Sequence, residues 1–196
     1  MNAELLLFDL PGYLLEGNEM SWFNQLSGIL QQYAGASAAQ APDTVDKDFD
    51  QFAHAAPPST IAEGLAAAFR SDQTPAFGQM AAQLFGQSDS NQRASLLNTL
   101  IATLGPTVIA QILGGRGGSV LGGLLSGGQR QVTPEQAEQV SPEEVKALAA
   151  EAEKQDPSII DRFSDFYAQH PDLIKTLGGA ALAIAMAKIA QRHSGM

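Results

Sequence analysis

The sequence predicts an all-α protein in which two small helical bundles are joined by a glycine-rich linker. Three observations lead to this prediction. Apolar residues recur at the three-and-four spacing of amphipathic helices in both halves of the chain. Helix-start and helix-stop residues separate these segments, and none of them alternates apolar and polar residues as a strand would. Glycines concentrate between Gly114 and Gly128, where the two halves meet.

The composition narrows the class of protein. A chain of 196 residues can form one domain or two small ones. It has no cysteine, which excludes disulfide frameworks, thiolate metal sites and cysteine nucleophiles. The net charge is −10, and the eleven Lys and Arg residues are scattered. Nucleic-acid binding is therefore not expected, because neutralising phosphates requires clustered cations.

The first nineteen residues differ from the rest of the chain, because Pro11, Gly12 and Gly17 interrupt any periodicity. We expect residues 1–19 to be either a disordered tail or a start-site overcall, with translation beginning at Met20. The segment lacks the basic flank and the apolar core of a secretory signal. The expected location is therefore cytoplasmic.

Residues 21–33 predict an amphipathic helix without a single charged residue. Its large apolar residues share one face: Trp22, Phe23, Leu26, Ile29, Leu30 and Tyr33. Such a face could enter a membrane interface or dock in the groove of a partner. The alternative, which we favour, is that it packs on its own domain.

Four further helices are predicted before the glycine-rich stretch. Each has a start signal, and three of them end at a glycine or a proline. The signals are Asp43 or Thr44 before a helix that ends at Pro57, a capping box of Thr60 and Glu63 before a helix to Arg70, Thr74-Pro75 before a helix to Gly86, and Asp89 with Gln92 before a helix to Gly105.

Residues 107–128 allow three interpretations: a flexible linker, a close-packing glycine helix, or the strand and loop of a nucleotide site. The nucleotide site is rejected, because the third glycine of a dinucleotide fingerprint falls on Val120 and no lysine follows for a phosphate-binding loop. A nucleophile elbow around Ser119 fails as well, because Leu121 stands where glycine is needed.

The other two interpretations stay open. Small residues recur every four positions and would line one face of a helix: Ala110, Gly114, Gly118, Gly122 and Ser126. Each glycine costs a helix roughly 1 kcal/mol relative to alanine. We therefore favour a flexible linker over residues 114–131, with an exposed apolar patch of Leu121, Leu124 and Leu125.

The C-terminal segment predicts a second helical domain over residues 132–193, after the first over residues 20–113. Two capping boxes begin its helices, Thr133 with Gln136 and Ser141 with Glu144. Asp156-Pro157 begins the next helix, and His170-Pro171 begins the last. The last helix is apolar on all sides between residues 175 and 188, a run of twelve residues where a membrane span needs about 20. We expect it to be the centre of the C-terminal bundle.

Several segments carry a resemblance to a known group: residues 132–135, 156–159, 166–171 and 177–180, with Met20-Ser21-Trp22-Phe23 near the other end. They resemble the corresponding parts of small uncharacterised bacterial proteins of the YidB-like, all-helical kind. The resemblance covers mainly the C-terminal third. It implies a bacterial helical protein and supplies no catalytic residue.

The residues that could carry metal or acid–base chemistry do not form a recognisable site. His54, His170 and His193 are far apart, and none lies in a zinc-binding spacing; His170 is interpreted as a helix-junction residue. Asp46, Asp48 and Asp50 imitate the start of a calcium loop, but Gln51 and Pro57 replace its glycine and glutamate. We expect these acids to form a solvated helix face.

The acidic pairs Asp161 with Asp165 and Glu143 with Glu144 are interpreted as helix surface rather than as acid–base groups. The sequence thus predicts no catalytic residue, no metal and no cofactor.

The favoured function is a non-enzymatic protein that acts through contacts with an unknown protein partner or with itself. The residues expected at the contact are those of the Trp22 face and the leucine patch. One alternative is a membrane-associated oligomer, built on the Trp22 helix and on close packing at Gly114, Gly118 and Gly122. An enzyme of unrecognised class is the second alternative.

Overall fold

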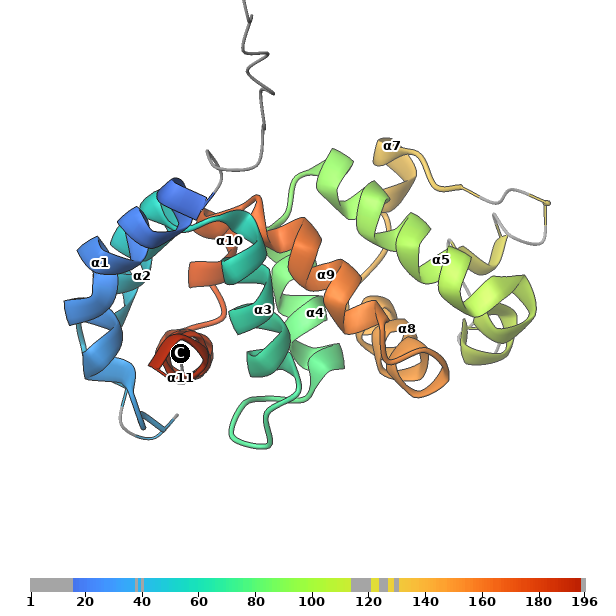
Figure 1. The fold of residues 1–196 in the computed structure, drawn as a ribbon. Coiled ribbons are helices and arrows are strands. Elements are labelled where there is room, and N and C mark those ends of the chain that lie inside the picture. Colours follow the sequence, from blue (N-terminus) through green and yellow to red (C-terminus); the bar gives the residue numbers. More distant parts are fainter. Residues whose placement is uncertain are drawn as a thin grey trace, which may run out of the picture.

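The structure is a computed structural model that describes residues 16–37, 39, 41–113, 121–123, 127–128 and 131–194. Side chains are described from Asn24 to Arg192 within these ranges. The described chain consists of α-helices and their connections, without a β-strand (Figure 1). The prediction of an all-α fold is confirmed.

Among the residues that the structure describes, five helices precede the glycine-rich stretch and five follow it. The first five are α1 (Glu16–Tyr33), α2 (Val45–Ala55), α3 (Pro58–Phe69), α4 (Phe77–Gln87) and α5 (Ser90–Leu113). The others are α7 (Pro134–Ala137), α8 (Pro142–Gln155), α9 (Ile159–Ala168), α10 (Pro171–Lys175) and α11 (Gly179–Ser194). Helix α1 begins at Glu16, five residues before the expected start at Ser21.

Helices from the two halves of the chain pack against each other. Helix α3 contacts both α9 and α11, α4 contacts α8, and α5 contacts α7 and α8. The main cluster of buried apolar side chains draws on both halves and runs from Leu26 to Ala190, and a small second cluster joins Ala68 to Ile184 and Ala185. The arrangement as two bundles is therefore not confirmed, because the described halves share one core. The apolar pattern of a helix shows that a face is buried but not which helix covers it.

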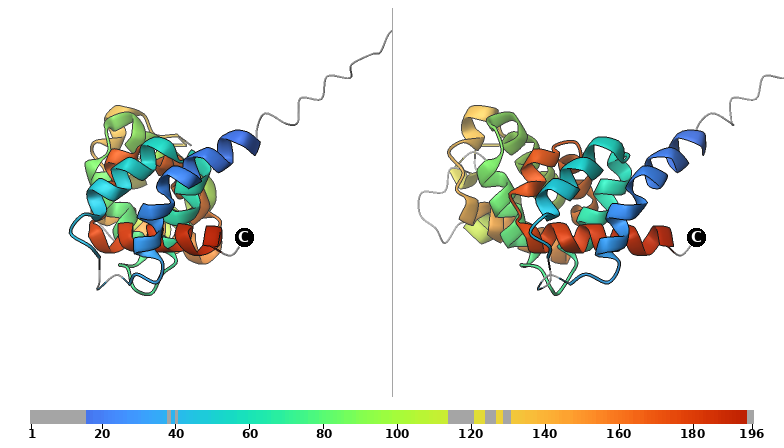
Figure 2. Two further views of the ribbon diagram at one scale, coloured as in Figure 1. Left: turned by 60° about the vertical axis from the view of Figure 1, so that its left-hand side comes forward. Right: turned by 90° about the vertical axis from the view of Figure 1, so that its left-hand side faces the viewer.

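Helix α11 is buried on all sides along its middle, where every residue from 181 to 187 is buried. Its neighbours are α1, α2 and α3 from the other half of the chain. In the right-hand view of Figure 2, α11 runs horizontally and α1 crosses it. The expected continuous helix from Pro171 is wrong, because Gly178, with φ of 87°, separates the short α10 from α11. A positive φ of this size ends a helix and favours glycine.

Helix α5 bends at Gly105, whose φ of 72° and ψ of 162° are not helical. The predicted stop at Gly105 thus marks a real break, but the chain resumes as helix from Pro106 to Leu113. The strand interpretation of residues 107–113 is wrong. Among the described helices, α5 alone is long and apolar enough to cross a membrane by length and composition. Its buried residues, Leu97 and Leu100 among them, belong to the protein core.

Three of the predicted helix starts are confirmed by reciprocal hydrogen bonds. They join Asp89 with Gln92, Thr133 with Gln136 and Ser141 with Glu144. The capping box at Thr60 is wrong, because α3 begins two residues earlier, at Pro58, and Thr60 lies buried inside its first turn. Proline suits the first position of a helix because it has no N–H to leave unpaired.

The predicted start at Thr74-Pro75 is also displaced. Helix α4 begins at Phe77 and has no side-chain cap. The Thr74 hydroxyl donates to the carbonyl oxygen of Ala68 at 2.6 Å, so it fastens the preceding loop to α3. Thr74 therefore stabilises the C-terminal end of α3 and does not cap the start of α4.

Candidate functional site

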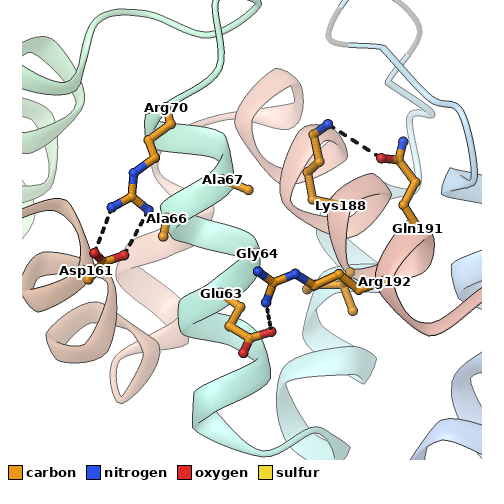
Figure 3. A pocket seen from close by; sticks show the side chains of 10 residues that line it. Glu63, Gly64, Ala66, Ala67, Arg70, Asp161, Lys188, Gln191 and Arg192 are labelled. Carbon is orange, nitrogen blue, oxygen red and sulfur yellow. Dashed lines mark hydrogen bonds and ion pairs between the residues drawn. The ribbon is translucent and has the colours of Figure 1, made fainter. Parts of the chain in front are cut away.

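A groove with a volume of about 450 Å³ lies over the exposed strip of α3, between α9 and α11 (Figure 3). We call it the α3 groove. Ten residues line it: Glu63, Gly64, Ala66, Ala67 and Arg70 from α3 and its C-cap, Asp161 from α9, and Lys188, Ile189, Gln191 and Arg192 from α11. Its volume lies within the range of about 300–1,000 Å³ that is usual for ligand sites.

The floor of the α3 groove is low because α3 carries small residues there. A Cβ added to Gly64 would lie 2.5 Å from Cδ1 of Ile189 and 3.0 Å from the carbonyl oxygen of Ala185. Glycine therefore lets α11 approach α3 closely. Ala67, one turn before Arg70, is partly exposed on the same strip. The small side chains on α3 create the hollow of the groove, and the longer side chains around it form its rim.

One end of the α3 groove is closed by an ion pair between helices. Arg70 donates from Nη1 to Oδ1 of Asp161 at 2.8 Å and from Nη2 to Oδ2 at 2.7 Å. This bidentate geometry matches the planar guanidinium to the carboxylate. The hydrogen bonds from Arg70 hold the pKa of Asp161 below its usual range. Both side chains are about half exposed, at 43% and 53%.

The other end holds a second ion pair, in which Nη1 of Arg192 lies 2.5 Å from Oε2 of Glu63. Lys188 stands one turn earlier on α11, and its Nζ contacts Oε1 of Gln191 at 3.5 Å. Among the described side chains, no carboxylate lies within 4.0 Å of Lys188. The rim therefore has three cations and two carboxylates, a local excess of positive charge in a chain whose net charge is −10.

No family model, no curated protein and no solved structure matches this chain. The YidB-like resemblance of its C-terminal third stays a prediction. The geometry of the described residues is thus the basis for assigning a function.

The sequence-predicted interaction face of α1 packs largely on its own chain. Leu26 and Leu30 are 5% and 2% exposed and belong to the core, and Ile29 packs against it. The favoured interpretation, in which this face packs on its own domain, is met only in part, because α1 contacts α2 and also α11 of the predicted second domain. The side chains of Trp22 and Phe23 lie outside the described part.

The second predicted surface is described only in part. Leu121 is fully buried in the core, so it is not part of an exposed apolar patch. Leu124 and Leu125 lie outside the described residues, as do Gly114 and Gly118 of the close-packing series. Gly122 is described and is partly exposed.

The aspartates that imitate a calcium loop connect helices instead. Oδ2 of Asp48 accepts from the Tyr33 hydroxyl at 2.7 Å, which ties α1 to α2. Oδ1 of Asp50 accepts from Nζ of Lys175 at 2.8 Å, which ties α2 to α10. Asp46 is exposed, as expected of a solvated face, whereas Asp48 and Asp50 are half-buried and pair with neighbouring helices. Within the described chain, no three His, Cys, Asp or Glu side chains gather where they could hold a metal ion.

His170 occupies the predicted junction. It is the N-cap residue of α10, and its ring centroid lies 5.1 Å from that of Phe166. The interpretation of His170 as a helix-junction residue is confirmed. His54 is exposed on α2, and the side chain of His193 lies outside the described part.

Sequence reasoning missed the α3 groove. It assigned Glu63 to a helix cap and Asp161 to acidic surface, and it gave Arg70 and Arg192 no role. One local signal was present: Lys188 and Arg192 are four residues apart at the end of a largely apolar helix, which places them on one face. The pairing of Arg70 with Asp161 joins residues 91 positions apart, and no local pattern reveals it.

Proposed function

We propose that this chain is a non-enzymatic protein that acts through contacts with another protein, and that the partner binds in the α3 groove. The observation that carries the proposal is the form of the groove. Its floor of Gly64, Ala66 and Ala67 is apolar and low, and its rim is charged. An apolar centre inside a polar rim is the usual anatomy of a protein-binding surface.

The charges of the rim also favour recognition over proton transfer. Asp161 accepts two hydrogen bonds from Arg70, which lower its pKa. A carboxyl group that acts as a general acid near neutral pH needs a raised pKa instead. Paired charges of this kind can exchange partners with an incoming protein and determine its orientation.

Photocrosslinking tests the proposed contact. A photoreactive amino acid placed at Ala67, in the groove, should give a discrete adduct of higher mass when the full chain is irradiated in the cells that make it. The matched control is the same amino acid at Ala102, an exposed position on α5. We expect an adduct from position 67 and none of the same mass from position 102. Equal adducts at both positions, or none at position 67, would contradict the proposal.

The membrane-associated oligomer is a second candidate, favoured by the length and composition of α5. Cell fractionation followed by a sizing column separates it from the first. Under the first proposal, most of the chain stays in the supernatant without detergent. If it pellets with membranes and needs detergent, the second candidate replaces the first. Substituting Gly118→Leu and Gly122→Leu should then change its assembly size.

A further inference from the structure

The cations of the α3 groove are arranged around a floor that has no charge of its own. Arg70 lies beside Asp161 and Arg192 lies beside Glu63, whereas the Lys188 side chain lies apart from both and extends toward Gln191 (Figure 3). Lys188 and Arg192 are one helical turn apart on α11. Because Arg192 is paired with Glu63, a carboxylate bound in the groove would offset the charge of Lys188. The molecule as a whole, with its net charge of −10, disfavours an acidic partner, so such a partner needs a site of locally positive charge.

The distance between the two ends indicates the form of the ligand. Glu63 and Arg70 are seven residues apart on α3, which corresponds to about 10 Å along the helix axis. Arg192 is held at Glu63, so its guanidinium and that of Arg70 stand at the two ends of this interval. One phosphate or one carboxylate can reach only one end. An extended peptide in the polyproline II conformation rises about 3.1 Å per residue with three residues per turn, so carboxylates three residues apart lie on one side of it and span about 9 Å.

We infer that the partner of the α3 groove is an acidic protein segment in extended form, with two carboxylates three residues apart and small residues between them. This inference rests on the proposed function and names the chemistry of the partner. One carboxylate binds at Arg192 in exchange with Glu63, and the other binds at Arg70 in exchange with Asp161. Lys188 supplies further positive charge at the rim. The small residues of the segment lie over Gly64 and Ala67, where larger side chains of α3 would exclude them.

The test uses a dye-labelled peptide of repeated Glu-Ser-Ala units and the full chain. Fluorescence anisotropy at about 50 mM salt, where charges are weakly screened, gives the dissociation constant. The double variant Lys188→Gln with Arg192→Gln should raise this constant about tenfold or more. The matched control, Lys47→Gln with Lys146→Gln, removes the same charge from α2 and α8 and should change it less than about twofold.

A second variant separates shape from charge. Ala67→Phe keeps every charge and fills the floor of the α3 groove, so it should also weaken peptide binding by about tenfold. Ala67 is partly exposed, so the larger side chain has room beside the core. Circular dichroism of each variant verifies that the helices are retained.

Several outcomes overturn the inference. They are no binding of the glutamate peptide, equal binding of a Lys-Ser-Ala peptide, equal weakening by the control pair, and full competition by inorganic phosphate or by vesicles of anionic lipid. If one of these occurs while the adduct at position 67 persists, the acidic partner is wrong and the protein-contact function stands. If the adduct is lost as well, both proposals fail.

Discussion

Arg70 and Asp161 connect α3 to α9 through one bidentate contact at the end of the α3 groove. Because both side chains are about half exposed, solvent screens their attraction, and such pairs contribute no more than about 1 kcal/mol. The lowered pKa of Asp161 makes this contribution depend on pH. It is complete above the pKa of the unfolded chain, about 3.9, and is lost as the pH falls through the lower pKa of the folded state.

We therefore expect Asp161→Asn to lower the melting temperature at pH 7 and to have a smaller effect below about pH 3. Thermal unfolding of the wild type and the variant at several pH values measures the difference. Arg70→Gln removes the same pair from the other side and should give the same pH dependence. A difference that is constant with pH would contradict the assignment of this pair.

At the scale of elements, Gly78 determines how closely α4 and α8 pack. A Cβ added to Gly78 would lie 2.7 Å from the carbonyl oxygen of Lys146 and 3.2 Å from the Cβ of Ala150. The first of these atoms belongs to the backbone of α8, which cannot turn aside as a side chain does. Gly78→Ala should therefore push the helices apart and destabilise the fold by about 1–3 kcal/mol.

Gly86 provides the control, because it lies on the same helix. A Cβ added there would meet its nearest atom, Cγ of Pro142, at 3.8 Å, which is ordinary contact. Gly86→Ala should therefore stabilise the protein by about 0.5–1 kcal/mol, since alanine favours the helix. Denaturant unfolding of both variants gives the two values. Equal effects in the two variants would show that helix propensity, and not the approach of α8, decides the result.

Most helices were predictable from the sequence because their signals are local. The capping residues Asp89, Thr133 and Ser141 act within one turn, and the structure places each where the sequence indicated. The signal at Thr60 failed because Pro58 competes for the same helix start. Local signals therefore predict an element well unless two of them overlap.

The packing of the elements was not predictable in the same way. Helix α3 is apolar on most sides, which predicts that it is buried. The pattern does not say which helices bury it. The structure covers it with α9 and α11, which come from beyond the glycine-rich stretch. The α3 groove follows from this packing, since residues of all three helices form its rim. The candidate site could therefore not be predicted from the sequence, because it depends on the same packing between helices as the shared core.

The shared core leads to a prediction for the whole molecule. If α3 and α11 require each other, neither residues 1–113 nor residues 131–196 should fold alone, because each fragment would expose the apolar faces that the other covers. Each fragment should lose its cooperative thermal transition, and mixing the two should restore helical signal and a sharp transition. Circular dichroism of the separate and mixed fragments measures this. Cooperative unfolding of each fragment alone would restore the organisation as two independent bundles, and the α3 groove would then be an interface between domains that can separate.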